Sequence, residues 1–380
     1  MGGWDVIVVG VGGMGSVACL ELARRGARVL GIEQHALGHA LGSSHGETRL
    51  YRRAYFEAPD YVPLMDRALA LWRELERESG EELAVQTGLA LFGPPRGGLL
   101  ERAEAHGAAH GIRFERLALT EAERRFPDLS AMPDAEAMFE PEAGFLRVER
   151  CVEVAARLAL ARGARIESNL RVTSLTSDGG GVRVETERGS FAAASVVLAA
   201  GPWSAPLLGG LGARLAVQRQ VLLWLACEPD AYRLDSGTPA FGFDTPAGFF
   251  YGFPSLEPGA LKVARHMLGE RVPSPAELDR ELRPEDARPV QEFAARHLPK
   301  AHSRVLRHHV CMYTMTPDEH FIVDRHPEEP RLVVAAGFSG HGFKFASAIG
   351  RAVADLALDG MTREPIGFLS ARRFAHFGAV

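Results

Sequence analysis

Cysteine is scarce in this chain, and its few thiols are too scattered to build a structural module. The chain has four cysteines and no C-x-x-C pair: Cys19, Cys151, Cys227 and Cys311. Such spacing excludes a disulfide framework or a zinc module and suits a reducing cytoplasm. The adjacent His308 and His309 lack an H-E-x-x-H pattern or a carboxylate at ligand spacing, so we expect a polar strand edge there and no metal site.

Long apolar runs and an excess of one charge are also missing. No apolar run approaches the about 20 residues that span a bilayer, and no basic region precedes the first apolar stretch as in a signal peptide. With 43 basic and 48 acidic residues the net charge is −5, which gives no reason to expect a nucleic-acid or membrane partner. We therefore expect a cytoplasmic protein whose 380 residues bury one large core or two coupled ones.

A complete dinucleotide-binding pattern stands at the start of the chain. Residues 5–9 are an apolar, β-branched run typical of a buried strand, and residues 10–15 follow at once with G-x-G-x-x-G spacing. A helix over 16–25 and a second strand over 28–32, which ends in Glu33, complete the unit. A glycine pattern alone is weak, but here strand, glycines, helix, strand and acid occur in order.

Each part of this unit has a physical role. Gly10 makes the tight turn, Gly12 lets the backbone approach a pyrophosphate, and Gly15 lets the helix pack on the strand. The helix N-terminus stabilises the phosphates. The carboxylate of Glu33 accepts hydrogen bonds from ribose hydroxyls.

Helical and strand patterns then alternate along the chain without internal repeats. Helices are expected over 61–77, over 150–161, over about 346–358, and after a capping box at residues 120–123. A β-meander is expected over 165–200, further sheet over 213–268, and a buried strand over 332–336. Because the strands that read as parallel come from both ends and the middle of the chain, two interleaved domains explain the pattern better than two consecutive ones.

Two arginines follow the first unit at a spacing that suits anion binding. Arg49 and Arg52 lie three residues apart, so a helical turn would put both guanidinium groups on one face. Together they suit a carboxylate or a flavin ring that becomes anionic, whereas isolated arginines are usually a solvated turn. Residues 42–46 also satisfy G-x-S-x-G, but residues 39–41 are a poor strand, so a hydrolase elbow is not expected.

These features, with two segments near the C-terminus, resemble a known family. The segments are 311–320 and the glycine-rich 337–345, which feeds the last helix. With residues 44–49 and 251–255, they make the chain similar, essentially end to end, to the monomeric sarcosine oxidase and N-methyltryptophan oxidase family of D-amino-acid-oxidase-like flavoenzymes.

The resemblance implies the fold class and the cofactor. The fold would be α/β, with a Rossmann-like FAD-binding domain over 1–83, 150–215 and 305–380, and a substrate domain on a mixed, largely antiparallel sheet over 84–149 and 216–304. The FAD would be joined covalently through its 8α-methyl carbon to Cys311. The residues expected around it are Gly10, Gly12, Gly13, Met14, Gly15, Glu33, Ser43, Ser44, Thr48, Arg49, Val172, Gly201, Trp203, Cys311, Gly337, Gly340, Gly342, Phe343 and Lys344.

The resemblance also implies catalytic and substrate-binding residues. The implied catalytic set is Lys262, Arg49, His45, Arg52 and Lys344. Arg52 and Lys344 would hold the substrate carboxylate, and Lys262 would face the flavin where oxygen is reduced. The residues implied around the substrate are Tyr251, His266 and Tyr313. Ser44, Glu47 and residues 256–258 depart from common family choices, which bears on substrate preference.

The implied activity is oxidation of the N-methyl group of a small secondary amino acid, with sarcosine first. O2 would be reduced to H2O2 and the imine hydrolysed to glycine and formaldehyde, by a protein that acts as a monomer. The alternatives with the same fold are N-methyltryptophan, pipecolate, proline or a fructosyl amino acid as substrate. A flavin dehydrogenase with another acceptor, a nucleic-acid modification factor and a non-enzymatic nucleotide sensor are weaker alternatives.

Overall fold

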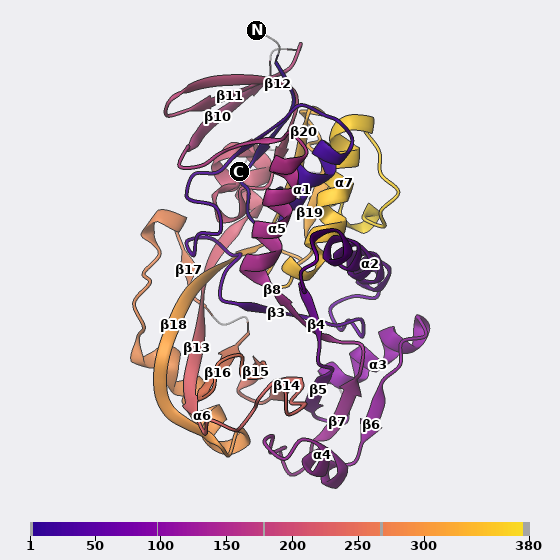
Figure 1. Cartoon of the computed structure of the whole chain (residues 1–380), viewed down its shortest axis with the longest axis vertical. Coiled ribbons are helices and arrows are strands. Elements are labelled where there is room, and N and C mark those ends of the chain that lie inside the picture. The colour runs from indigo at the N-terminus through magenta and orange to yellow at the C-terminus, as the bar shows by residue number, and fades with distance from the viewer. Residues whose placement is uncertain (1–2, 97, 178, 267–268, 375–380) are drawn as a thin grey trace.

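The computed structural model describes residues 3–96, 98–177, 179–266 and 269–374. It has an upper body around a largely parallel sheet and a lower body around a large antiparallel sheet, with a small sheet between them (Figure 1). The expected α/β class is confirmed. Within the described residues, no helix is long and apolar enough to cross a membrane.

The parallel sheet carries the dinucleotide pattern. Its five parallel strands lie in the order β9-β2-β1-β12-β20. Their bounds are β9 Arg165–Glu167, β2 Val29–Ile32, β1 Trp4–Val9, β12 Gly189–Leu198 and β20 Leu332–Ala336. β19 (Ile322–Arg325) pairs with β20, and the hairpin of β10 (Val172–Ser177) and β11 (Val182–Thr186) extends from β12 as the expected meander.

Alternating side chains of β1 pack on opposite sides of this sheet. Val6 and Val8 contact the apolar faces of the helices, and Ile7 and Val9 belong to a second cluster on the other side. The helices of the first side are α1 (Gly13–Arg24), α2 (Tyr61–Ser79), α5 (Val148–Ala161) and α7 (Ala346–Asp359). At Gly350 of α7 a Cβ atom would lie 2.5 Å from Val17, so this glycine lets α7 approach α1 closely.

The large sheet forms the lower body (Figure 1). Its order is β18-β13-β16-β15-β14-β5-β7-β6, with β17 also on β13, and among the described residues only β14 and β5 pair in parallel. The bounds are β18 Ala301–Met315, β13 Ala216–Cys227, β16 Ala260–Arg265, β15 Gly248–Gly252, β14 Ala240–Thr245, β5 Leu89–Gly93, β7 Glu136–Glu140, β6 Glu115–Leu117 and β17 Arg271–Val272. The helices α3 (Leu99–Ala109), α4 (Leu119–Arg125) and α6 (Pro284–His297) complete this body. The sheet expected over 213–268 thus includes four of these strands, and its last residues, 267–268, lie outside the described residues.

The capping box expected at residues 120–123 is wrong. Helix α4 already begins at Leu119, with Ala118 as its N-cap and no capping side chain. Pairing of β6 with β7 fixes the end of the extended chain at Leu117, so Thr120 falls inside the first turn, where its side chain cannot cap.

A small antiparallel sheet joins the two bodies. It consists of β3 (Thr48–Tyr51), β8 (Gly144–Arg147) and β4 (Ala84–Gln86).

The division of the chain into an FAD-binding domain and a substrate domain stays a proposal, and we propose one change to it. The boundary at residue 305 falls inside β18, which pairs with β13 along most of its length, so the boundary is better placed after Met315.

Candidate active site

A cavity of about 490 Å³ lies at the carboxyl ends of the parallel strands. Val9, Ile32, Ala199 and Gly337, at or just after the ends of four of these strands, line it, as do Tyr251 and Tyr313 of the large sheet. Open α/β sheets bind ligands at this edge. The volume is in the range of cofactor and small-molecule sites.

The glycine turn at one end of the cavity has no room for side chains. Gly10 has a φ of +88°, and a Cβ there would lie 2.6 Å from the Ala199 carbonyl oxygen. A Cβ at Gly13 would lie 2.9 Å from the Phe343 ring, and the Gly13 amide donates to Ser44 Oγ at 3.0 Å. The turn therefore presents bare backbone at the start of α1, which fits a pyrophosphate.

Glu33 is held rigidly beside this turn. Its carboxylate accepts from the Val11 amide at 2.9 Å and from the His35 amide at 3.1 Å. Although burial by itself raises the pKa of Glu33, the hydrogen bonds from His39 and these amides lower it overall. The carboxylate stays anionic and keeps free lone pairs for ribose hydroxyls.

A buried arginine also lines the cavity. Arg52 is 3% exposed, and its guanidinium lies 3.6 Å from the centre of the Phe56 ring. Its Nη2 donates to both oxygens of Glu57 at 2.8 Å, whereas its buried Nη1 has no partner among the described residues. Burial opposes ionisation of Glu57, but the Arg52 charge prevails and lowers the pKa of that carboxyl to about 2.

Lys344 lies near Arg52, since both side chains contact Tyr55. Its Nζ donates to the His341 carbonyl oxygen at 2.8 Å and to the Tyr55 hydroxyl at 3.4 Å. Burial and the neighbouring Arg52 lower the pKa of Lys344 to about 7. Burial likewise lowers the pKa of His266 to about 4 and that of His341 to about 3, so both imidazoles are neutral at neutral pH.

Arg49 does not lie on a helical turn, so that expectation is wrong. It belongs to β3, which pairs with β8, and Arg52 follows just after the strand ends. Both side chains nevertheless line the cavity, because the chain turns at the end of β3. The Nη2 of Arg49 donates to the Ser43 carbonyl oxygen at 3.0 Å and lies 3.6 Å from Cys311 Sγ.

Most of the predicted site residues line this one cavity, but five do not. They are Gly15, His45, Thr48, Lys262 and Cys311. Cys311 lies behind the lining, against Arg49. His45 is buried, its Nδ1 is 3.2 Å from His309 Nδ1, and burial and Arg49 lower its pKa to about 3.

Lys262 is buried beside a second, much smaller cavity. Its Nζ donates to Thr48 Oγ1 at 2.8 Å, to the Thr48 carbonyl oxygen at 2.9 Å, and to the Gly46 carbonyl oxygen. Burial and Arg49 lower the pKa of Lys262 well below its usual value, whereas the carboxylates of Glu47 and Glu149 raise it.

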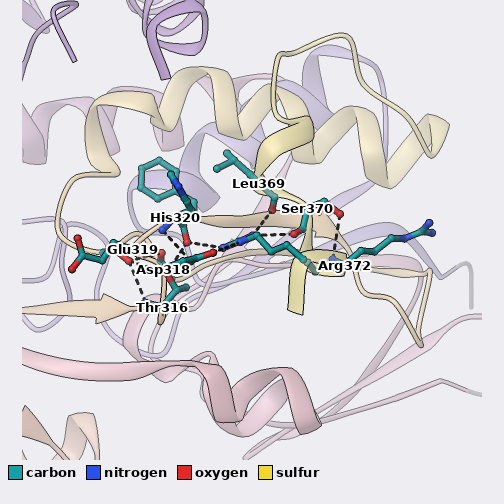
Figure 2. A network of polar contacts seen from close by, with 12 residues as sticks. Thr316, Asp318, Glu319, His320, Leu369, Ser370 and Arg372 are labelled. Carbon is teal, nitrogen blue, oxygen red and sulfur yellow. Dashed lines mark hydrogen bonds and ion pairs between the residues drawn. The ribbon is translucent and has the colours of Figure 1, made fainter. Parts of the chain in front are cut away.

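The motif at residues 316–320 braces the cavity from outside rather than lining it. Arg373 donates to Asp318 at 2.7 Å and to the His320 carbonyl oxygen at 2.8 Å, which ties residues 367–374 to this turn (Figure 2). The Glu319 carbonyl oxygen lies 3.2 Å from His341 Nε2. The turn therefore supports the loop that carries Lys344.

Sequence reasoning missed Tyr55, Glu57 and His341. Glu57 pairs with Arg52, Tyr55 contacts both Arg52 and Lys344, and His341 bonds to Tyr55. Two aromatic residues and an acid in the five positions after Arg52 were the available signal for Tyr55 and Glu57. His341 stands inside segment 337–345, for which the predictions named the glycines, Phe343 and Lys344 but not the histidine.

The cavity, which is lined by a glycine turn, a buried acid and two buried basic side chains, defines a dinucleotide-dependent oxidoreductase. The family described as FAD dependent oxidoreductase (DAO) matches residues 5–356, and the chain belongs to this family. Within the described residues, no group of three or more His, Cys, Asp or Glu side chains is placed to hold a metal ion.

Two curated relatives show to which group of this family the chain belongs. It is 38% identical to monomeric sarcosine oxidase from Bacillus sp. (strain B-0618) over 376 residues, which cover 97% of this chain and 96% of that protein. It is 36% identical to N-methyl-L-tryptophan oxidase from Yersinia pestis (strain Pestoides F) over 373 residues, 98% of this chain and 99% of that protein. The chain is thus a flavoprotein oxidase of the sarcosine oxidase family, which oxidises amines or amino acids with FAD.

A solved structure agrees with this assignment. NikD, an unusual amino acid oxidase essential for nikkomycin biosynthesis, superposes with a TM-score of 0.86 at 28% identity, covering 97% of this chain and 98% of that chain. The mixed architecture of a parallel and a large antiparallel sheet is therefore that of the amino acid oxidases.

Proposed function

We propose that the protein oxidises the N-methyl group of a small secondary amino acid, with sarcosine as the first candidate. O2 is reduced to H2O2, and the imine is hydrolysed to glycine and formaldehyde. The observation that carries this proposal is the pair of buried basic side chains, Arg52 and Lys344, which line the cavity and both contact Tyr55. The unpartnered Nη1 of Arg52 is a donor that a substrate carboxylate would satisfy.

The residues present fit FAD, which when bound supplies the hydride acceptor and the electrons for O2. In the proposal, Arg52 and Lys344 hold the substrate carboxylate and so fix the orientation of the reacting carbon. The amine must lose its proton before hydride can leave the adjacent carbon. The charges of Arg49, Arg52 and Lys344 lower the pKa of a nearby ammonium, and Glu57 offsets one of them.

The remaining site residues have proposed roles as well. Cys311 would hold the flavin covalently through its sulfur, from which Arg49 Nη2 lies 3.6 Å away. Lys262 would assist the reduction of O2, and His45 would lie near the flavin ring, although neither side chain lines the cavity. Tyr251, His266 and Tyr313 surround the substrate. A monomer in the cytoplasm completes the proposal.

A peroxide assay across candidate amines tests the substrate. Sarcosine, N-methyl-L-tryptophan, pipecolate, proline and a fructosyl amino acid are compared by initial rate at equal concentration. We expect the highest kcat/KM with sarcosine. A higher value with another amine would move the proposal to that substrate, and electron transfer to a dye without oxygen uptake would reject an oxidase.

The flavin of the native protein should stay with the chain after acid precipitation. A thioether bond survives acid, whereas FAD held by hydrogen bonds is released when the fold is lost. Cys311→Ser should therefore give a colourless pellet and a yellow supernatant, and Cys227→Ser, which changes a buried thiol away from the cavity, should keep a yellow pellet. A colourless pellet from the native protein would contradict the covalent bond.

Carboxylate binding should weaken as the pH rises above about 7. Lys344 has a pKa of about 7 in the ligand-free protein, so it is an ammonium below that pH and a neutral amine above it. Because an anion favours the ammonium, the Kd of acetate should rise about tenfold per pH unit above 7. Spectral titration of the flavin measures this Kd.

Lys344→Met gives the matched comparison. It should bind acetate more weakly at pH 6 and show a flat profile between pH 6 and 9. Glu57, His266 and His341, with pKa values of about 2, 4 and 3, do not titrate in this window. A native profile that is itself flat would argue against Lys344 as a carboxylate ligand.

A further inference from the structure

The ammonium of Lys262 is held entirely by one short turn. Its three donors meet three acceptors: the Gly46 carbonyl oxygen, the Thr48 carbonyl oxygen at 2.9 Å and Thr48 Oγ1 at 2.8 Å. The position of Nζ is therefore set by residues 46–48, because all three acceptors belong to them.

This turn has a backbone conformation that needs support. Glu47 has a φ of +69°, in the left-handed region that residues other than glycine rarely adopt. Gly46 has a φ of +92°, and a Cβ there would lie 2.7 Å from Leu222. A non-glycine residue stays in this region only when its surroundings hold it there.

Glu149 supplies that support. It stands in the first turn of α5, and its Oε1 accepts from the Gly46 amide at 2.6 Å and from the Glu47 amide at 3.1 Å. Its Oε2 accepts from the Glu47 amide at 3.0 Å, and the Val148 amide donates to the Glu47 carbonyl oxygen at 2.9 Å. The amides of Gly46 and Glu47 thus point at one carboxylate. The Gly46 carbonyl oxygen accepts from the Thr48 amide at 2.8 Å as well as from Lys262. The Thr48 carbonyl oxygen accepts from Arg49 Nη1 at 2.9 Å as well as from Lys262.

The side chain of Glu47 is engaged elsewhere. It accepts from Trp224 Nε1 at 3.0 Å and from Arg307 at 2.7 Å, and these three residues line the small cavity together with Lys262. Glu47 therefore anchors the outer side of the turn, while Glu149 holds its backbone.

We propose that Glu149 is a positioning residue for the oxygen half-reaction, because its carboxylate locks the turn whose oxygens place Lys262. The inference rests on the proposed function of Lys262. It assigns a role in the same half-reaction to Glu149, which does not line the cavity. It predicts that loss of the acceptor at residue 149 disturbs reaction with O2 and leaves anaerobic reduction by substrate nearly unchanged.

Two variants separate the hydrogen bonds from other effects. Glu149→Ala removes the acceptor and should slow flavin reoxidation by O2 about tenfold or more, since small misplacements of a reacting group have effects of this size. Glu149→Gln keeps an oxygen acceptor and should stay within about threefold of the native rate. Glu153→Ala, on the exposed side of the same helix, is the control and should behave as native.

Amide hydrogen exchange of the holoenzyme gives a measurement that is independent of activity. Exchange at Gly46 and Glu47 should accelerate in Glu149→Ala and remain slow in Glu149→Gln. Unchanged exchange and unchanged reoxidation in Glu149→Ala would overturn the proposal, as would equal losses in the Ala and Gln variants. Normal reoxidation by Lys262→Met would instead reject the role proposed for Lys262, while the exchange experiment would still test the turn.

Discussion

Lys262→Met is expected to slow the reaction of reduced flavin with O2 by about 10²- to 10³-fold, the effect of removing one preorganised charge partner from a buried site. Lys262 is 4% exposed, and its Nζ is held against residues 46–48. Methionine has a similar length and an apolar end, which keeps the packing against Phe253 and Trp224. Stopped-flow mixing of reduced enzyme with oxygenated buffer measures the rate.

The expected result is a split between the two half-reactions. Anaerobic reduction by substrate should change by less than about threefold, because Lys262 does not line the cavity that holds the substrate end. Lys300→Met is the matched control, since that lysine is partly exposed and pairs with Asp128 away from the cavity. Equal slowing of both half-reactions would contradict a specific role in oxygen reduction.

Arg52→Ala is expected to lower kcat/KM by a factor that corresponds to about 2–5 kcal/mol. The variant loses the proposed carboxylate ligand. It also leaves Glu57 without the guanidinium that keeps its pKa at about 2, so an uncompensated acid faces the anionic substrate. Steady-state kinetics with the preferred amine measure the effect.

The neighbouring arginine provides the control for this variant. Arg53 pairs with Asp66 and Glu142 outside the cavity, and partly exposed pairs of this kind contribute about 0–1 kcal/mol. Arg53→Ala should therefore keep kcat/KM within about threefold of native. If Arg52→Ala behaved like Arg53→Ala, the carboxylate would have to bind elsewhere.

The N-terminal unit could be predicted closely because its signals are local. The strand expected over 5–9 is β1, Trp4–Val9, and the expected second strand and Glu33 lie where the pattern put them. The helix begins at Gly13 rather than at residue 16, because the last glycines of the pattern already form its first turn. Apolar alternation and glycine spacing need no knowledge of distant residues.

The small sheet could not be predicted, because it depends on residues far apart in the chain. Arg49 of β3 pairs with Leu146 of β8, and no pattern within residues 43–53 predicts this pairing. The local spacing of Arg49 and Arg52 suggested a helical turn, and long-range strand pairing overrode it. The role of Glu149 could not be predicted for the same reason, since its carboxylate accepts hydrogen bonds from amides that lie more than a hundred positions earlier.

The scarcity of lysine in the composition could have indicated two of the site residues. The chain has only three lysines, Lys262, Lys300 and Lys344, among 43 basic residues. Two of the three are buried at or beside the cavity. Arginine stays charged when buried, whereas lysine changes its pKa readily, so a lysine retained among so many arginines indicates a site where that property matters.

The order of strands in the parallel sheet also affects when the protein can take up its coenzyme during translation. β1 leaves the ribosome long before its neighbour β12, and the loop at 337–344 that completes the cavity emerges later still. Until α7 has been made, the nascent polypeptide therefore has an incomplete nucleotide pocket. The side chains of Val6 and Val8 in β1 are not yet covered by that helix. We therefore expect flavin to bind only after the whole polypeptide has been made.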